Sequence, residues 1–302
     1  LNISMAQNFE RVVSRLENIQ AIEPLLSALR TISMGTWQSA LSKMDKMQRY
    51  ERYYDHILAE ILPHLKERNL GTAEPHRQKS SIADAIILLV GSERGLCGKF
   101  NQLLVDSALS WIEQQAFPSY QVWAMGSRLI SELERHAVDI AWRKTLASGS
   151  LPTYIDTYRL AINWLSQYES FAFNKLFILF NENLKGGRYR FSAFSLLPYE
   201  IYHPVSMIGE TEELWPPYII ETDPKGIYRH IIEHYIASSF YQILLKSAVA
   251  ENSARFHLME EAKDNADEII EELQGVINTE RKRRIPQEMQ ELASGAGLLD
   301  NR

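Results

Sequence analysis

The stretch "AENSARFHLMEEAKDNADEIIEEL" at residues 250–273 contains neither glycine nor proline, and its apolar residues recur every three or four positions. The same pattern extends outward in both directions, with no glycine between Gly226 and Gly275 and no proline between Pro224 and Pro286. A helix of about 60 residues would be about 90 Å long. So long an apolar period is typical of a coiled coil. The residues that trace one face are Ile227, Ile231, Tyr235, Ile243, Leu244, Ala248, Leu258, Ala262, Ala266, Ile269, Leu273, Val276 and Ile277.

The other end of the chain has a matching pattern. From Met5 to about His64, apolar residues again recur at helical spacing: Phe9, Val12, Leu16, Ile19, Leu26, Leu29, Ile32, Trp37, Leu41 and Met44. Pro24 is an interior breaker that should kink or split this helix. We therefore predict a long antiparallel coiled coil formed by an N-terminal helix, residues 5–67, and a C-terminal helix, residues 225–297.

The middle of the chain changes period. Short apolar runs alternate with helix-like segments at 101–115, 126–137 and 153–170, which predicts a mostly parallel sheet covered by helices. We expect a Rossmann-like α/β domain over residues 82–222, flanked by a linker at 68–81 and a proline-rich loop at 203–224. The expected strands are "AIILLVG" (85–91), "YQVWAM" (120–125), "VDIAW" (138–142), "NKLFILFN" (174–181) and "GGRYRFSAFSLLP" (186–198).

Composition narrows the class of protein. The 302 residues carry a net charge of −6 with a pI near 5.8, which argues against a nucleic-acid binder. Cys97 is the only cysteine, so an intrachain disulfide and a four-cysteine zinc site are both excluded. The longest apolar stretch, Ala85 to Val90, is far shorter than the roughly 20 residues of a membrane-spanning helix. These features favour a soluble cytoplasmic chain.

The glycine-rich stretch "VGSERGLCGKF" at residues 90–100 suggests a phosphate-binding loop. A P-loop needs a glycine five positions before its Gly-Lys pair and a serine or threonine after the lysine. Here Glu93 and Phe100 occupy those positions, and a carboxylate would repel the phosphate. We interpret the stretch as a tight turn between strand and helix, with Gly91, Gly95 and Gly98 as structural glycines and Cys97 as a small buried residue.

A second motif suggests a metal site. "HIIEH" at residues 230–234 has the H-x-x-E-H spacing that places two zinc ligands one helical turn apart, with a glutamate as general base. A zinc-dependent hydrolase using His230, Glu233 and His234 is therefore an alternative function. The other interpretation is a set of polar residues on the outer flank of a long helix.

A third motif is the basic run in "ERKRRIPQEM", residues 280–289. It is short and contains no aromatic residues of the kind that accompany nucleic-acid sites. It could be a solvated helix face, a surface for an acidic protein partner, or a nucleic-acid patch.

Three of these stretches together resemble the γ subunit of F-type ATP synthases, the central rotor shaft. "RLENIQAI" contains the family pattern N-x-Q-x-I at Asn18, Gln20 and Ile22, and "SERGLCG" is similar to the family's SDRGLCG with Glu93 in place of Asp. The C-terminal stretch from Ala250 matches S/A-E-x-x-A-R-x-x-x-M-x-x-A-x-D-N-A. The resemblance continues through Asn278, Arg281, Ile285, Gln287, Glu288, Glu291 and "SGA" at 294–296.

The resemblance implies a non-catalytic subunit that binds no nucleotide, cofactor or metal and couples ion flow through a membrane ring to conformational change at catalytic sites. Its partners would be the α/β hexamer, the ε subunit and the membrane c-ring, and no nucleic acid. It would be peripheral to the cytoplasmic face of the bacterial inner membrane. The residues implied to contact a catalytic subunit are Arg281, Lys282, Gln287, Glu288 and Glu291.

The chain also departs from the family pattern. Ser33 stands where the family has a lysine, and Pro24 and Pro286 lie in helices that the family leaves uninterrupted. The lack of a cysteine pair rules out the thiol-regulated chloroplast type. These departures suggest a divergent or alternate-type copy, such as a sodium-translocating one.

Overall fold

A computed structural model describes residues 2–66, 83–146, 150–184, 186–199, 221 and 223–295. By contacts the chain divides into two units, which are described separately. The helical unit comprises Leu1–Ile32 and Phe256–Arg302, and the α/β unit comprises Ser33–Arg255. The elements are α1 (Asn2–Lys66), β1 (Ala83–Val90), α2 (Phe100–Gln115), β2 (Tyr120–Met125), α3 (Ser127–Arg135), β3 (Ile140–Lys144), α4 (Tyr154–Glu169), β4 (Phe173–Asn183), β5 (Tyr189–Leu197) and α5 (Pro224–Gly295).

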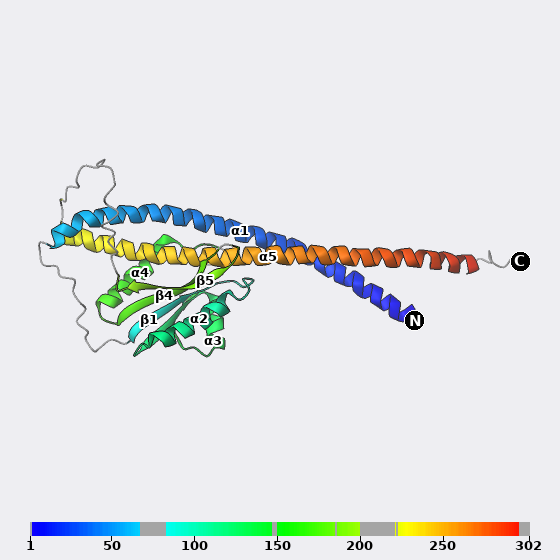
Figure 1. The fold of residues 1–302 in the computed structure, drawn as a ribbon, viewed down its shortest axis with the longest axis horizontal. Coiled ribbons are helices and arrows are strands. Elements are labelled where there is room, and N and C mark those ends of the chain that lie inside the picture. Colours follow the sequence, from blue (N-terminus) through cyan, green and yellow to red (C-terminus); the bar gives the residue numbers. More distant parts are fainter. Residues whose placement is uncertain are drawn as a thin grey trace. The chain divides into compact units, whose positions relative to one another are not determined.

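The predicted mixed architecture is confirmed, with strands and helices alternating between two long terminal helices (Figure 1). The largest boundary shift among the strands is at the start of the fifth, which begins at Tyr189 rather than at residue 186. The predicted linker at 68–81 lies outside the described residues, as does nearly all of the predicted loop at 203–224.

The α/β unit contains a five-stranded sheet in the order β3-β2-β1-β4-β5. The pairs β1–β2, β1–β4 and β2–β3 are parallel, and β5 pairs antiparallel with β4. Leu88 in the central strand pairs with Trp123 of β2 and Ile178 of β4. β1 reads as a continuous apolar run because helices cover both faces of the sheet, as is usual for parallel strands.

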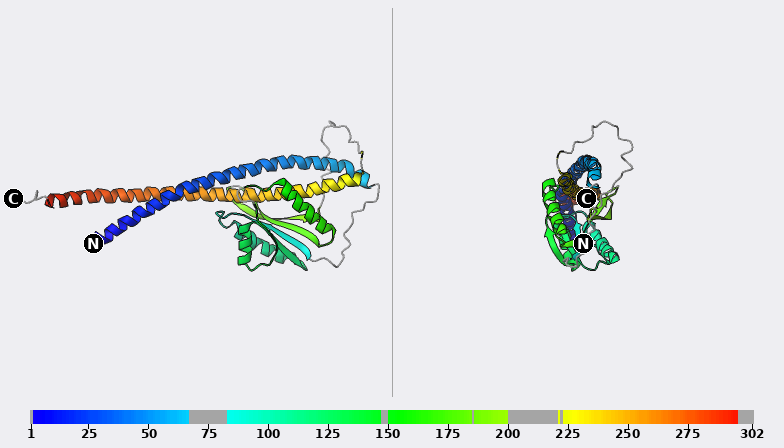
Figure 2. Two further views of the ribbon diagram at one scale, coloured as in Figure 1. Left: turned by 180° about the vertical axis from the view of Figure 1, so that it is seen from behind. Right: turned by 90° about the vertical axis from the view of Figure 1, so that its left-hand side faces the viewer.

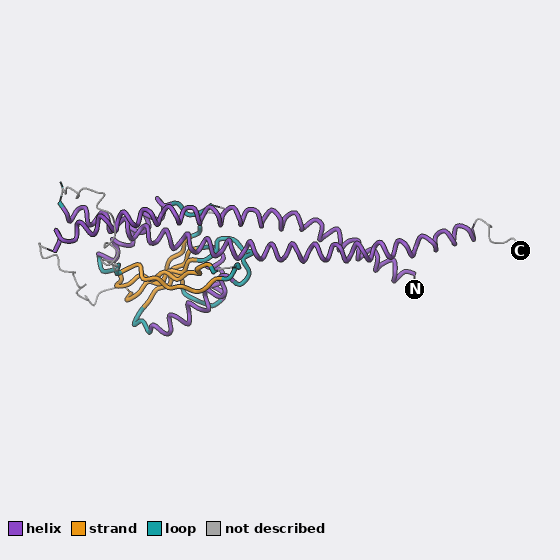
Figure 3. Tube along the Cα trace, turned by 45° about the horizontal axis from the view of Figure 1, so that its top comes forward, coloured by secondary structure: helices purple, strands orange, loops and turns teal. Residues whose placement is uncertain are grey.

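Helices flank the strands of this sheet (Figure 3), and two apolar cores lie on its opposite faces. Ile87 and Leu89 face α2 and α3, packing with residues such as Leu104 and Leu129. The alternate residues of β1 face the other way, where the core includes Trp164 of α4 and Phe240 of α5. The period of two along β1 therefore places α4 and α5 together on one face.

Within the α/β unit, α1 and α5 run antiparallel, as their colour gradients show (Figure 2). Ala40 of α1 is fully buried in a cluster with Tyr241, Leu245 and Val249 of α5. Further along α1, Tyr54 stacks near His234, which lies earlier on α5. Later residues of α1 therefore contact earlier residues of α5, so the two helices pair antiparallel, as predicted.

The helical unit has the same antiparallel pairing. Arg30 forms an ion pair of 3.4 Å with Glu260, and Glu23 forms one of 3.7 Å with Lys263. The guanidinium of Arg30 also lies 5.9 Å from the ring centre of Phe256. The helix is unbroken across Pro24, so this proline does not split it. Among the described residues, no helix combines the length and apolarity needed to cross a membrane.

Candidate functional site

The glycine-rich turn after β1 is buried against neighbouring elements of the α/β unit. Ser92 is fully buried, and its backbone N–H donates to Asn101 Oδ1 at 3.0 Å. The Asn101 amide in turn donates to Ser92 Oγ at 2.8 Å. These reciprocal bonds fix the turn to the first residues of α2, so its backbone is held in one shape.

The three predicted turn glycines have different surroundings. A side chain on Gly91 would place its Cβ 2.6 Å from Leu129 Cβ and 2.7 Å from Asn101 Oδ1, so the backbones could not approach as they do. Gly98 has φ +61°, a conformation that favours glycine. Gly95 has ordinary space, with Arg128 Nε 3.8 Å from an added Cβ. Leu96 adopts φ +62° within the same turn.

Glu93 binds the backbone where α3 begins. Its carboxylate accepts hydrogen bonds from the N–H of Ser127 at 3.0 Å and of Leu146 at 2.8 Å, and from the Ser127 hydroxyl. Burial raises the pKa of Glu93, but these hydrogen bonds outweigh it and lower the pKa below its ordinary value. A helix N-terminus attracts anions, and here the protein's own carboxylate takes that place.

Arg255 of α5 holds the outer part of the turn. Its side chain is 4% exposed, and its guanidinium donates to the carbonyl of Gly95 at 3.1 Å and to that of Arg94 at 3.3 Å. It also donates to Asn252 Oδ1 at 3.0 Å and forms an ion pair with Glu251. Burial raises the pKa of Glu251, and the adjacent Arg255 opposes that rise. We call Glu251, Asn252 and Arg255, with the carbonyls they hold, the turn clamp.

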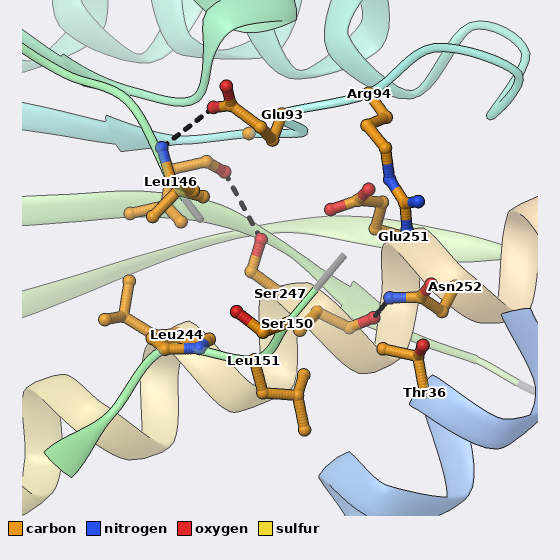
Figure 4. Close-up of a pocket in the computed structure, with 14 residues that line it drawn as sticks. Thr36, Glu93, Arg94, Leu146, Ser150, Leu151, Leu244, Ser247, Glu251 and Asn252 are labelled. Carbon is orange, nitrogen blue, oxygen red and sulfur yellow. Dashed lines mark hydrogen bonds between the residues drawn. The ribbon is translucent and has the colours of Figure 1, made fainter. Parts of the chain in front are cut away.

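The clamp joins two stretches that the sequence singles out separately. "SERGLCG" supplies the carbonyls, and "AENSAR" at 250–255 supplies the charged side chains. A hydrogen bond from the Ser247 hydroxyl to the Val90 carbonyl, 3.4 Å long, extends the contact by two turns of α5 (Figure 4). The end of β1 is thus fastened to α5 by polar bonds in a buried setting.

A small cavity of about 50 Å³ lies beside the clamp. Figure 4 shows Glu93, Arg94 and Glu251 around it, with Thr36 contributed by α1. Sites for nucleotides and similar ligands have volumes of roughly 300–1,000 Å³. The cavity has room for water-sized molecules, which supports the interpretation of the stretch as a turn.

Cys97 lies on the inner side of the same turn. It is 4% exposed and packs with Phe100, Ala250 and Tyr189. Burial raises the pKa of its thiol, which keeps it protonated and unreactive. The prediction of a small buried residue is confirmed.

The side chains of "HIIEH" lie near one another on α5, with His230 Nδ1 3.9 Å from Glu233 Oε2 and the two imidazole ring centres 4.6 Å apart, but they have different further partners. His230 is exposed, and Glu233 pairs with Arg229 at 3.4 Å. His234 turns inward, where its Nδ1 lies 3.1 Å from the hydroxyl of Tyr154. The described part of the chain contains no group of three histidine, cysteine, aspartate or glutamate side chains arranged to hold a metal. Nothing in this geometry supports the zinc hydrolase alternative.

The predicted partner contacts lie near the end of α5 in the helical unit. Arg281 and Lys282 are exposed, and the next residue, Arg283, pairs with Glu280 at 3.7 Å. Gln287, Glu288 and Glu291 lie in the helix, but their side chains are outside the described part of the structure. Helical spacing places positions 281, 288 and 291 on one face.

Sequence reasoning missed the buried polar residues of the clamp as site residues. Arg255 belongs to the recognised motif, but the motif alone did not indicate that its side chain is buried and paired. Tyr154, in contrast, reaches His234 from α4, 80 residues earlier in the chain, and no local pattern indicates that contact.

Comparisons with known proteins agree with this architecture. A family model described as "ATP synthase" matches residues 8–299. The ATP synthase gamma chain of Mannheimia succiniciproducens is 24% identical over 297 residues, covering 96% of this chain and 99% of that relative.

Solved structures share the fold. A chain of the Euglena gracilis mitochondrial ATP synthase, determined as OSCP/F1/c-ring, has a TM-score of 0.60 and 11% identity, covering 97% of this chain and 95% of that one. A chain from the central stalk and c-ring of the Tetrahymena thermophila mitochondrial ATP synthase has a TM-score of 0.54 and 15% identity, covering 79% of this chain and 99% of that one.

Proposed function

The chain belongs to the ATP synthase gamma-chain family, and we propose that it turns as the central-stalk rotor of an F-type ATP synthase or ATPase. In that role it couples ion flow through a membrane ring to conformational change at the catalytic sites of the hexamer. The observation that carries the proposal is the family match over residues 8–299, which includes both terminal helices and the sheet between them.

The fold suits a part that transmits torque. In both units α1 and α5 run antiparallel and bury apolar side chains between them, with Ala40 in one unit and Leu273 in the other as examples. Tightly packed helix pairs have few alternative arrangements, so they resist local deformation. The turn clamp adds a polar attachment of the sheet to α5, since Arg255 donates hydrogen bonds to two backbone carbonyls of the turn.

The protein is a subunit of an enzyme complex, and we propose that it contributes no catalytic group itself. The support is local: Glu93 occupies the α3 N-terminus, and the cavity beside the clamp has a volume of only about 50 Å³. Rotation would act on the catalytic subunits by presenting different faces of the stalk, which biases each site among its conformations.

The proposed partners are the α/β hexamer, the ε subunit and the membrane c-ring. The chain would lie on the cytoplasmic face of the bacterial inner membrane, held there through the complex. Exposed Arg281 and Lys282 would meet acidic side chains of a catalytic subunit, with Gln287, Glu288 and Glu291 further along the same helix.

Charge reversal tests this contact. The double variant Arg281→Glu and Lys282→Glu should assemble with the hexamer but hydrolyse ATP more slowly, because like charges would oppose each other at the contact. The measurement is ATPase turnover of the purified complex at low and high salt, and salt should reduce the defect by screening.

The matched control reverses two exposed arginines of the α/β unit, Arg128→Glu and Arg159→Glu. These should leave turnover near the wild-type value. Wild-type turnover in the Arg281 and Lys282 variant would refute the assigned contact, while failure of the wild-type chain to assemble with the hexamer would refute the function as a whole.

A further inference from the structure

His234 lies inside a cage of aromatic rings contributed by three helices of the α/β unit. Its ring centre is 4.9 Å from that of Tyr158 and 5.9 Å from that of Tyr54, with interplanar angles of 34° and 17°. The hydroxyl of Tyr154 lies 3.1 Å from Nδ1. One imidazole therefore contacts α1 through Tyr54 and α4 through both Tyr154 and Tyr158.

The titratable groups around the ring come from each of those helices. α1 contributes Tyr54, and α4 contributes Tyr154 and Tyr158. α5 contributes His230, whose ring centre is 4.6 Å away, and Glu233. Glu233 is the only carboxylate among the described groups that bear on the pKa of His234, and it is also paired with Arg229.

Burial lowers the pKa of His234 below its ordinary value, and the neighbouring His230 lowers it further. Glu233 acts in the opposite direction without reversing the result. Near neutral pH the ring is therefore uncharged, and a neutral imidazole has one acceptor nitrogen. With its hydrogen on Nε2, His234 can accept the Tyr154 hydroxyl hydrogen at Nδ1.

We propose that His234 is a pH-sensitive fastening. It joins α1, α4 and α5 in the α/β unit while its ring is neutral, and protonation of the ring loosens this contact. The proposal concerns contacts inside the chain, so it does not depend on the rotor function.

Protonation changes the cage in a defined way. Nδ1 gains a hydrogen and can no longer accept from Tyr154, whose hydroxyl must turn to accept instead. A charge also enters a partly buried site next to His230. Because the folded chain binds this proton more weakly than the unfolded chain, stability falls as the pH drops below the ordinary value of 6.5. The loss is complete once the pH is below the lowered pKa of the folded state.

Hydrogen exchange on the full-length chain tests the proposal. Between about pH 8 and about pH 5, amide exchange corrected for its intrinsic rate should accelerate in the turns that contain Tyr54 and Tyr154. The limit is about tenfold for each unit by which the pKa is lowered. Nitrogen NMR of the imidazoles in the same samples should show that His234 titrates below its ordinary value of 6.5 and is the Nε2–H tautomer when neutral.

Three variants separate the fastening from simple packing. His234→Phe keeps an aromatic ring but cannot titrate, so the acceleration should disappear. His230→Gln removes the exposed neighbour, so the acceleration should remain but be complete at a higher pH than in the wild type. The end of the acceleration moves because the loss of a like charge raises the pKa of His234, as a change in the NMR titration midpoint would show.

In His230→Gln the raised pKa brings protonation of His234 closer to neutral pH. The acceleration therefore ends at a higher pH than in the wild type, although it still begins near the ordinary value of 6.5. Tyr154→Phe should also raise the midpoint, because it removes a donor to the neutral ring. Unchanged acceleration in His234→Phe, or protonation of His234 without faster exchange, would overturn the proposal.

Discussion

Arg255 satisfies most of its donors inside the protein, although its side chain is almost fully buried. It pairs with Glu251 and donates to the carbonyls of Gly95 and Arg94. A buried ion pair of this kind contributes little net stability compared with apolar residues, but removal of one partner is costly because the other charge is left unpaired. The clamp therefore specifies where the turn sits on α5 more than it adds to overall stability.

This asymmetry gives a prediction for two variants. Arg255→Met should lower the free energy of unfolding by about 3–5 kcal/mol, because Glu251 remains buried without its ion-pair partner. Adding Glu251→Gln should restore part of that loss. Denaturant unfolding followed by the fluorescence of Trp123, Trp142 and Trp164, which pack together in the α/β unit, measures both values. A double variant no more stable than the single one would contradict the account.

Two glycines of the turn differ in the space around them, so the same substitution can be compared at both. Gly91→Ala should destabilise the chain by about 1–3 kcal/mol, the usual cost of overpacking, because the added methyl group meets Leu129 and Asn101 below 3 Å. Gly95→Ala has space at its position and ordinary φ, so its unfolding midpoint should stay close to the wild-type value. Equal losses in the two variants would show that the close approach at Gly91 is not what requires glycine.

At the scale of elements, α1 and α5 depend on a small residue where they approach each other. Ala40 is fully buried against Tyr241, Leu245 and Val249. Ala40→Leu should cost about 1–3 kcal/mol, since the larger side chain must push the helices apart. Thermal unfolding by circular dichroism checks this, with the exposed neighbour Ser39→Leu as the control. A similar shift in both variants would argue against close packing at this point.

These elements could be predicted from the sequence because their apolar residues recur at regular spacing. The apolar run of β1 and the helical spacing of α5 are local patterns, and each appears in the structure with nearly the expected ends. Pro24 was harder to judge from sequence. A proline removes one N–H from a helix interior and costs about 3 kcal/mol, but the helix continues through Pro24, and the ion pair between Glu23 and Lys263 joins the two helices beside it.

Contacts between distant parts of the chain were less predictable. The sequence indicated that "SERGLCG" forms a turn and not a phosphate loop, but not that Arg255 holds its carbonyls or that Glu93 binds the start of α3. The "HIIEH" spacing matched a pair of metal ligands, although polar residues on the outer flank of a helix were the favoured interpretation. His234 proved to face inward because α4 places Tyr154 and Tyr158 beside it, which no local spacing could indicate.

At the scale of the whole molecule, family membership and the two terminal helices lead to one claim, that this chain rotates within its complex. Single-molecule observation tests it most directly. A probe on Ser110→Cys, an exposed site of α2, in a Cys97→Ala background would report motion of the α/β unit in surface-attached complexes. The account predicts stepwise rotation in one direction when ATP is supplied. A probe that stays fixed while the same complexes hydrolyse ATP would contradict it.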